Sequence, residues 1–154
     1  MMATRIDLKG LRDLGKAFAT LNDQVQQKIA RAATSAGATA FKKEIARRAP
    51  VADAPYRVED VVVQPRNIER NVVTKRLKPS ETSATSEHLV VVRGKRKYGY
   101  ASRVAALQEF GTVDMPAQPF FRPGAAAAAE TAANAVRDRF GKRINAEIKK
   151  LEKS

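Results

Sequence analysis

The chain has no cysteine and no tryptophan, and its 154 residues include a single histidine. Without cysteine it can form no disulfide, no thiolate nucleophile and no sulfur-ligated zinc site. The one histidine, His88, stands just before an apolar stretch, with no pair of carboxylates nearby at the spacing of metal ligands. We therefore expect no metal, no cofactor and no catalytic residue, and we interpret His88 as a residue at the entry of a strand.

Long apolar runs are also missing. No stretch approaches the roughly 18 consecutive apolar residues of a membrane-spanning helix, and residues 1–21 lack the apolar block of a signal peptide. We expect a chain that is made in the cytoplasm of its host and has no membrane partner.

Aromatic residues make up only 6% of the chain, and much of its 44% hydrophobic fraction is alanine. Alanine side chains bury little area, so at roughly 25 cal/mol per Å² such a core gives an isolated monomer modest stability. A length of 154 residues fits one domain, since a single core typically serves roughly 100–200 residues. We expect one domain over residues 1–154 that gains part of its stability from assembly.

Acidic residues are scarce relative to basic ones, with 16 Asp and Glu against 29 Lys and Arg and a net charge of +13. Such an excess favours contact with nucleic acid, with an acidic neighbouring subunit, or simply with water, and composition does not separate these. The densest cluster is a candidate contact for a polyanion at a basic hairpin over residues 93–100. Its cations are Arg93, Lys95, Arg96 and Lys97, followed by Tyr98 and Tyr100.

Hydrophobic spacing predicts a mixed chain. Period-two alternation over Ile6–Leu8 predicts a short edge strand, and three-and-four spacing over Leu11–Leu21 predicts a helix. Asn22 can cap a second helix, which should end near Arg48 because Pro50 disfavours helical geometry in the residue before it.

β-branched runs predict the strands. Val61–Val63 reads as an ordered excursion or a strand within an extended loop near residues 49–67. Val72–Val73 and Leu89–Val92 read as antiparallel strands joined by a second extended loop near 79–87.

The C-terminal half predicts two helices. A short one over Val104–Phe110 can be closed by Gly111 in a left-handed conformation. Met115–Pro123 holds three prolines and is expected to be irregular, and a long helix follows to Leu151. Its alanine run over Ala125–Ala129 lets another backbone approach closely. These elements predict an α+β fold, a small antiparallel sheet packed with helices and a long C-terminal helix.

Glu109 is the one carboxylate that invites a catalytic interpretation, within the segment Gln-Glu-Phe-Gly-Thr. It has no partner in sequence that would complete an acid–base pair. A structural hydrogen bond to loop amides is the better interpretation.

Two segments carry a family resemblance. The first, Tyr100–Thr112, reads Tyr-Ala-Ser-Arg-Val-Ala-Ala-Leu-Gln-Glu-Phe-Gly-Thr, and the second, Met115–Pro123, reads Met-Pro-Ala-Gln-Pro-Phe-Phe-Arg-Pro. Together they resemble the tail-component family of lambdoid phages, whose members are described as tail-completion, neck or head-tail joining proteins. The helix that closes with Ala49 and Pro50 is also similar to that family, although residues 52–66 replace its usual threonine-glycine turn.

The resemblance implies a structural virion protein and no enzyme. It implies a homo-oligomeric ring of sixfold or twelvefold symmetry at the tail or head-tail junction, assembled in the host cytoplasm. Its partners would be neighbouring neck, tail-terminator, tail-tube, portal or adaptor proteins, with DNA passing only transiently through the channel.

The second segment has a physical interpretation of its own. Its prolines stiffen the loop, and its two phenylalanines are large anchors, of which we expect one in the core and one at an interface. Arg122 can make a planar contact to a carboxylate or lie at the surface. The predicted subunit interface comprises Met115, Pro116, Pro119, Phe120, Phe121, Arg122, Pro123, Ala125 and Ala129.

The alternative is a small basic nucleic-acid-binding protein that uses the 93–100 hairpin. Cations interleaved with aromatic rings are typical of surfaces that hold single strands. A solvated hairpin tip has the same composition, and nothing in the segment reads bases.

Overall fold

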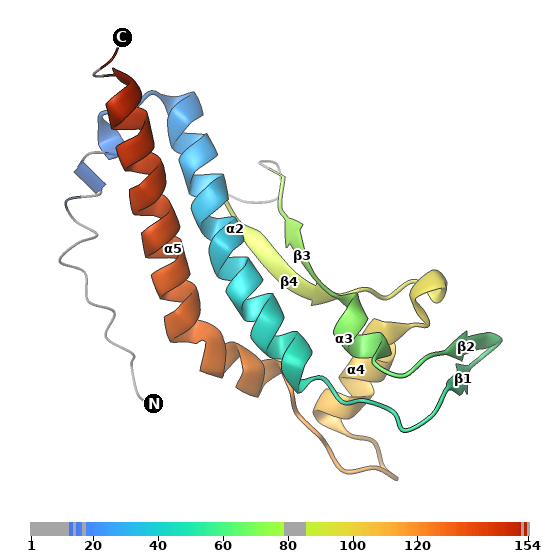
Figure 1. Ribbon diagram of the computed structural model, residues 1–154. Coiled ribbons are helices and arrows are strands. Elements are labelled where there is room, and N and C mark those ends of the chain that lie inside the picture. The colour runs from blue at the N-terminus through green and yellow to red at the C-terminus, as the bar shows by residue number, and fades with distance from the viewer. Residues whose placement is uncertain (1–12, 14, 17, 79–85, 152, 154) are drawn as a thin grey trace.

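The computed structural model describes residues 13, 15, 16, 18–78, 86–151 and 153 of the chain, and it has the predicted α+β fold (Figure 1). The elements run in the following order: α2 (Asp23–Arg48), β1 (Tyr56–Val58), β2 (Val61–Val63), α3 (Asn67–Asn71), β3 (Val72–Arg76), β4 (His88–Val92), the 3₁₀ helix η2 (Arg96–Tyr98), α4 (Ala101–Phe110) and α5 (Phe121–Leu151). The predicted strand at Ile6–Leu8 and most of the 79–87 loop lie outside the described residues.

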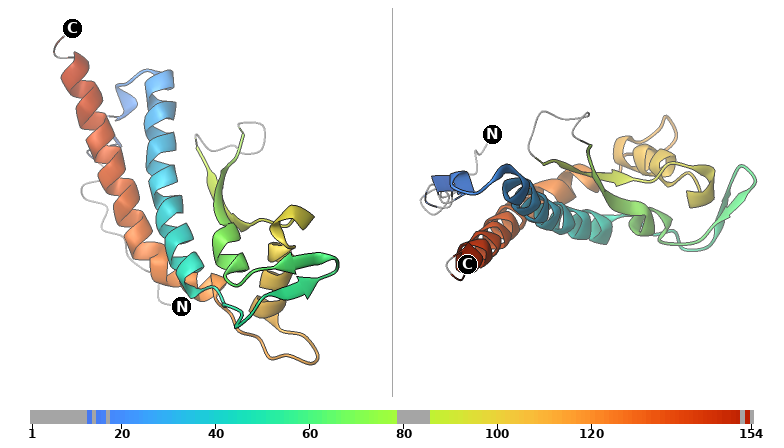
Figure 2. Two further views of the ribbon diagram at one scale, coloured as in Figure 1. Left: turned by 45° about the vertical axis from the view of Figure 1, so that its right-hand side comes forward. Right: turned by 90° about the horizontal axis from the view of Figure 1, so that it is seen from above.

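The two long helices α2 and α5 lie side by side and antiparallel (Figure 1). The strands β3 and β4, with α3 and α4, pack beside the end where α2 finishes and α5 begins, and the β1–β2 hairpin projects farthest from the helical pair (Figure 2). The loop that joins α4 to α5 therefore lies at one end of the molecule.

The bounds of α2 confirm the sequence prediction at both ends. The Asn22 side chain accepts a hydrogen bond of 3.0 Å from the Val25 backbone N–H, which satisfies one of the unpaired donors of the first turn. The helix ends at Arg48, and Ala49 is extended before Pro50, as a residue preceding proline prefers.

The antiparallel strands confirm the sequence prediction, but they form two separate hairpins and no single sheet. In the first, Tyr56 pairs with Val63 and Val58 with Val61, so the valine run is a strand of an ordered hairpin. In the second, β3 and β4 pair from Val72 opposite Val92 to Arg76 opposite His88.

Two clusters of apolar side chains hold the helices and strands together. The larger one joins the sheet end to the helices and is centred on Ile45, Ile68, Val72, Ala105 and Phe120. The smaller one lies toward the C-terminal end of α5 and contains Leu21, Ile29 and Ile144. Phe18 and Phe140 pack against it, with their ring centroids 4.9 Å apart.

The alanine-rich face of α5 allows another backbone to approach closely, and α2 of the same chain packs against this face. Ala128 and Ala132 are buried, whereas Ala129 is exposed and Ala125 packs against the larger cluster. On the facing helix, a Cβ added to Gly37 would lie 2.6 Å from Cγ2 of Val136, so only glycine fits without a shift.

We expect Gly37→Ala to lower the free energy of unfolding by about 1–2 kcal/mol, although alanine favours helix over glycine. The cause is overlap with Val136, whose branched side chain has essentially one rotamer in a helix. Chemical denaturation measures the effect. Adding Val136→Ala to Gly37→Ala should recover part of the loss, and Gly15→Ala, where a Cβ meets nothing within 4 Å, should not destabilise. An unchanged Gly37→Ala would contradict this packing.

Candidate functional site

The candidate functional site is the junction between α4 and α5, which contains the segment that the sequence singled out. Gly111 ends α4 with a φ of +76° and a ψ of −179°, so the positive φ was predicted correctly and the left-handed helical geometry was not. A Cβ at Gly111 would lie 2.8 Å from both the Ala117 nitrogen and the Met115 oxygen. The loop therefore closes tightly over a residue that must be glycine.

Glu109 holds the start of α5 in place. One carboxylate oxygen accepts hydrogen bonds of 2.8 Å from the backbone N–H groups of Phe120 and Phe121. The other accepts from the Arg122 backbone N–H at 3.2 Å and from its Nε at 2.9 Å. A carboxylate on α4 thus caps α5, since Phe120, the residue before the helix, has no side-chain oxygen, which confirms the structural interpretation of Glu109.

This cap explains where α5 begins. The sequence predicted irregular structure through Pro123, which was wrong for the last three residues because Phe121, Arg122 and Pro123 form the first helical turn. Proline is tolerated there, since the first four N–H groups of a helix have no intrahelical partner.

The charge of Glu109 is stabilised although the side chain is only 5% exposed. Burial raises the pKa of Glu109, but the hydrogen bonds from the Arg122 side chain and from three backbone N–H groups outweigh it and lower the pKa to about 2. The group is therefore a carboxylate at neutral pH, with its oxygens committed to the junction. A carboxylate in this state is a poor general base.

The structure places one of the two phenylalanines in the core, as predicted, and the interface role expected for the other stays a prediction. Phe120 is 3% exposed and belongs to the larger apolar cluster. Phe121 is half-buried and meets Phe120 edge to face, with 6.2 Å between ring centroids. Phe120 is thus a core residue and is unavailable to a neighbour.

An apolar groove of about 370 Å³ opens beside Phe121. Its walls are β4, α4 and the first turn of α5, contributed by Val90–Val92, Ala105, Ala106, Phe110, Phe120 and Phe121. Phe110 is 70% exposed at its rim, and the Arg122 guanidinium lies 5.2 Å from the centroid of its ring. Sequence reasoning missed the exposure of Phe110, because the three-residue spacing of Val104, Leu107 and Phe110 suggests one apolar face, whereas the structure buries Ala101, Ala105 and Glu109 instead.

The rest of the predicted interface segment lies at the surface. Pro116 and Pro119 are exposed and Met115 is half-buried, while Arg122 and Pro123 are exposed on α5. Arg122 donates to Glu109 from its side-chain Nε and from its backbone N–H. The pair is therefore not bidentate through two guanidinium nitrogens.

The basic cluster does not form the predicted hairpin. Residues 96–98 are a 3₁₀ helix leading into α4, because Gly99 and Tyr100 both adopt left-handed geometry and turn the chain. Arg96 is paired with Asp60 from the β1–β2 turn. Arg93 and Lys97 both lie over the Tyr98 ring, at 4.8 and 5.0 Å from its centroid, and Lys95 is exposed. Two cations already lie against this ring, so a nucleic-acid base would have to compete with them to stack on it.

His88 begins β4, as predicted, and its Nδ1 lies 2.9 Å from the Thr34 hydroxyl. Burial, and after it the charge of Arg76, lowers the pKa of His88. In the described part of the chain, no group of three or more acidic or histidine side chains is placed to hold a metal ion. None of the helices described there has the length and apolar character to cross a membrane.

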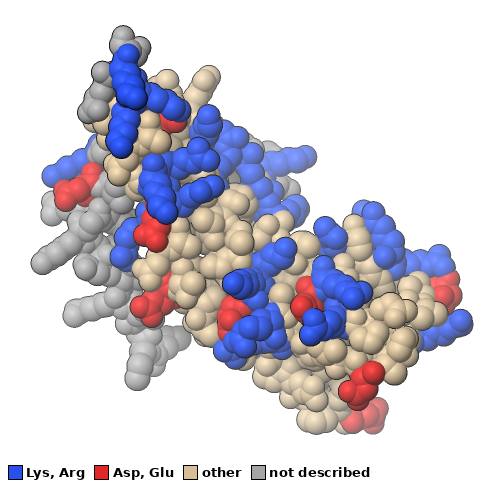
Figure 3. Space-filling view, in the orientation of Figure 1, with Lys and Arg blue, Asp and Glu red and all other residues tan. Residues whose placement is uncertain are grey.

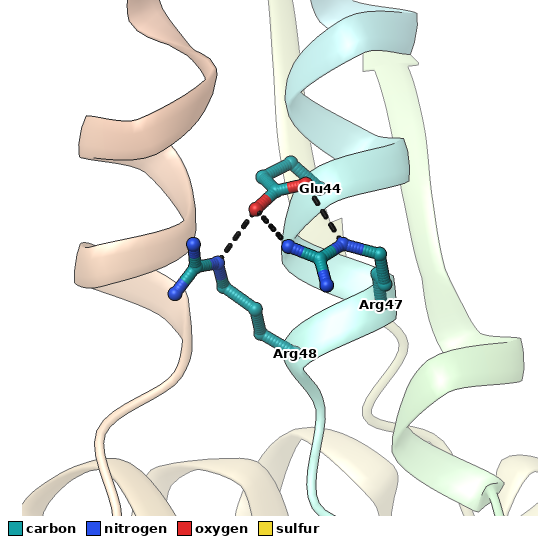
Figure 4. Close-up of polar contacts among 3 residues, drawn as sticks. All are labelled: Glu44, Arg47 and Arg48. Carbon is teal, nitrogen blue, oxygen red and sulfur yellow. Dashed lines mark hydrogen bonds and ion pairs between the residues drawn. The ribbon is translucent and has the colours of Figure 1, made fainter.

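A second polar cluster closes the same end of the helical pair. Glu44 accepts from Arg47 at 3.0 and 2.7 Å and from Arg48 at 2.7 Å, all on α2 (Figure 4). Hydrogen bonds from Arg47 and Arg48 lower the pKa of Glu44 to about 2. The cluster is solvated, and its contribution to stability is correspondingly small.

Comparisons with known proteins found no match. No family model, no curated protein and no solved structure is similar to this chain. Functional inference therefore depends on the geometry of the junction and on the resemblance in its sequence.

We expect Glu109→Gln to lower the free energy of unfolding by about 2–3 kcal/mol at pH 7, because the amide places a donor against N–H donors and carries no charge. Glu130→Gln, on the exposed face of α5, is the matched control and should change little. Urea unfolding across pH measures both.

The pH dependence of this loss has a defined sign. The folded pKa of about 2 lies below the ordinary 4.5, so the stabilisation is complete above pH 4.5 and disappears as the pH falls toward 2. The difference between wild type and Glu109→Gln should shrink over that interval. A difference that stays constant from pH 7 to pH 2 would show that the carboxylate charge is not responsible.

Proposed function

We propose that this protein is a structural subunit of a tailed bacteriophage particle, a tail-completion or neck protein that forms a ring at the head-tail junction. Its function is binding, and its partners are copies of itself and neighbouring neck, tail or portal proteins. The observation that carries the proposal is the α4–α5 junction. The segment that resembles the tail-component family forms this junction at one end of the molecule, where Glu109 holds it by hydrogen bonds to the start of α5.

The apolar surface at this end supports a binding function. Phe110 and Leu107 are exposed on α4, Val113 is exposed on the loop, and Phe110 also lines the apolar groove. Contiguous exposed apolar surface rimmed by polar groups is typical of protein interaction sites. The interface that we propose is therefore centred on Phe110 and Phe121, with Phe120 removed from it because that side chain fills the core.

The charge distribution supports protein partners more than a nucleic-acid track. Figure 3 shows Lys and Arg spread over both the helical pair and the sheet end of the visible face, with Asp and Glu between them. Several of these cations are already paired within the chain, among them Arg47, Arg48, Arg96 and Arg103. A dispersed positive field attracts acidic partners and keeps the free subunit soluble.

In the phage that encodes this chain, we expect purified tailed particles to contain the protein in six or twelve copies. A nonsense mutation in its gene should leave heads and tails that are complete but unjoined, and expression of the wild-type chain in trans should restore joining. Quantitative mass spectrometry and electron microscopy measure these outcomes. Infectious, joined particles without the protein would contradict the proposed function.

A further inference from the structure

The most exposed apolar side chain at the junction is presented on a braced turn. Val113 is 103% exposed. Its turn is closed by hydrogen bonds from Thr112 N–H to the Met115 carbonyl, 2.8 Å, and from Asp114 N–H to the Thr112 hydroxyl, 3.3 Å. A third bond of 2.7 Å, from Gln118 N–H to the Gln108 carbonyl, ties the loop back to α4. We call Val113 and Asp114 the knob.

The groove beside Phe121 complements the knob in polarity and in charge. Its walls are mostly apolar, and its charged lining residues are the buried Glu109 and the cation Arg122, whose side chain is 68% exposed. The Arg122 guanidinium is positioned by Glu109 through Nε and by the Phe110 ring. Within the described ranges Glu109 is its only acidic partner, and Asp114 has no ion pair there.

We propose that the knob of one copy of this chain inserts into the groove of a second copy, with Val113 against Phe110 and Phe121 and Asp114 against Arg122. This inference rests on the proposed function and names the contact that joins neighbouring subunits. Knob and groove are different surfaces, so each copy can give one contact and receive another. Such a contact repeats from head to tail and closes a ring when its rotation divides the circle.

Charge complementarity between Asp114 and Arg122 supports a second copy as the occupant. Chains of net charge +13 repel one another, so self-association requires a local pair of opposite charges. Asp114 supplies the acidic member next to an apolar side chain, and Arg122 supplies the basic member next to an apolar cavity. A braced turn loses little conformational entropy on docking, because its backbone is already fixed.

Sedimentation velocity over a concentration series tests the contact in the full chain. Val113→Ser removes the apolar knob, and we expect it to raise the self-dissociation constant about tenfold or more. Phe110→Asp places a carboxylate at the rim of the groove, and we expect it to abolish association. Val62→Ser is the matched control, an exposed valine on the outer hairpin, and should associate like wild type. Thermal unfolding should show all three variants folded.

Mixing the variants separates knob from groove. Val113→Ser keeps an intact groove, and Phe110→Asp keeps an intact knob, so an equimolar mixture retains one good contact per pair. We expect each variant alone to be monomeric at a concentration where the mixture forms a one-to-one dimer and wild type forms larger rings, as seen by native mass spectrometry.

Salt dependence tests the Asp114–Arg122 pair. Added salt screens the general repulsion in every variant, but it weakens the ion pair only where Asp114 is present. Wild-type association should therefore gain less from added salt than association of Asp114→Asn.

Two results overturn the contact: a wild-type chain that stays monomeric at millimolar concentration, or a Val113→Ser variant that associates as tightly as Val62→Ser. Failure of the contact and failure of the proposed function are distinguishable. Particles that contain the protein while Val113→Ser associates normally retain the function and refute the contact. A chain that associates through Val113 but is missing from particles retains the contact and refutes the proposed function.

Discussion

The hydrogen bonds from the start of α5 to the Glu109 carboxylate fix the relation between the two halves of the molecule. Two oxygens receive three backbone N–H groups and one guanidinium, all within 3.2 Å. Charge-assisted bonds of this kind are stronger than neutral ones, and here the accepting carboxylate is buried. Glu109 fixes the direction of the first turn of α5. Because α5 packs along α2, this direction also determines where the α2–α5 pair lies relative to the strands.

The same interaction makes the exposed surface of the junction usable. With α5 anchored, Phe120 is held in the core, Phe121 is left half-buried beside it, and Arg122 is laid across Phe110. Gly111 permits the reversal that brings Glu109 within reach of those amides. Glu109, Gly111 and Phe120 therefore have structural roles in these two segments, and Phe110 and Arg122 have exposed surface left for binding.

Local chemistry let the sequence predict part of this arrangement. Asn22 before a periodic stretch and Pro50 after it fixed both ends of α2, because capping and the restriction before proline act within a few residues. The role of Glu109 was also predictable, since a lone carboxylate near a loop more often binds amides than substrate. The first turn of α5 was missed because its cap comes from α4, eleven residues away, and three prolines within nine residues argue against helix.

What the sequence could not supply was the environment of the cations. Arg93, Lys95, Arg96 and Lys97 form a simple basic run in the sequence, and only the fold brings Asp60 from another hairpin against Arg96. Tyr98 likewise looked available for stacking until Arg93 and Lys97 were found over its ring. Long-range pairing changes the meaning of such a run, because part of its charge is neutralised and its aromatic ring already has cations against it.

Phe110 and Val113 are the two most exposed of the large hydrophobic side chains in the described residues, and folding stability does not explain their exposure. Leaving two large apolar side chains in water forgoes roughly 1.5–3 kcal/mol each, in a chain whose alanine-rich core has little stability to spare. The junction nevertheless holds both side chains out on a turn and a helix end that hydrogen bonds and glycine geometry keep rigid. An apolar projection and an apolar groove at the same end of the molecule expose less surface to water as two halves of an interface, which supports the proposal that this chain is a subunit of an assembly.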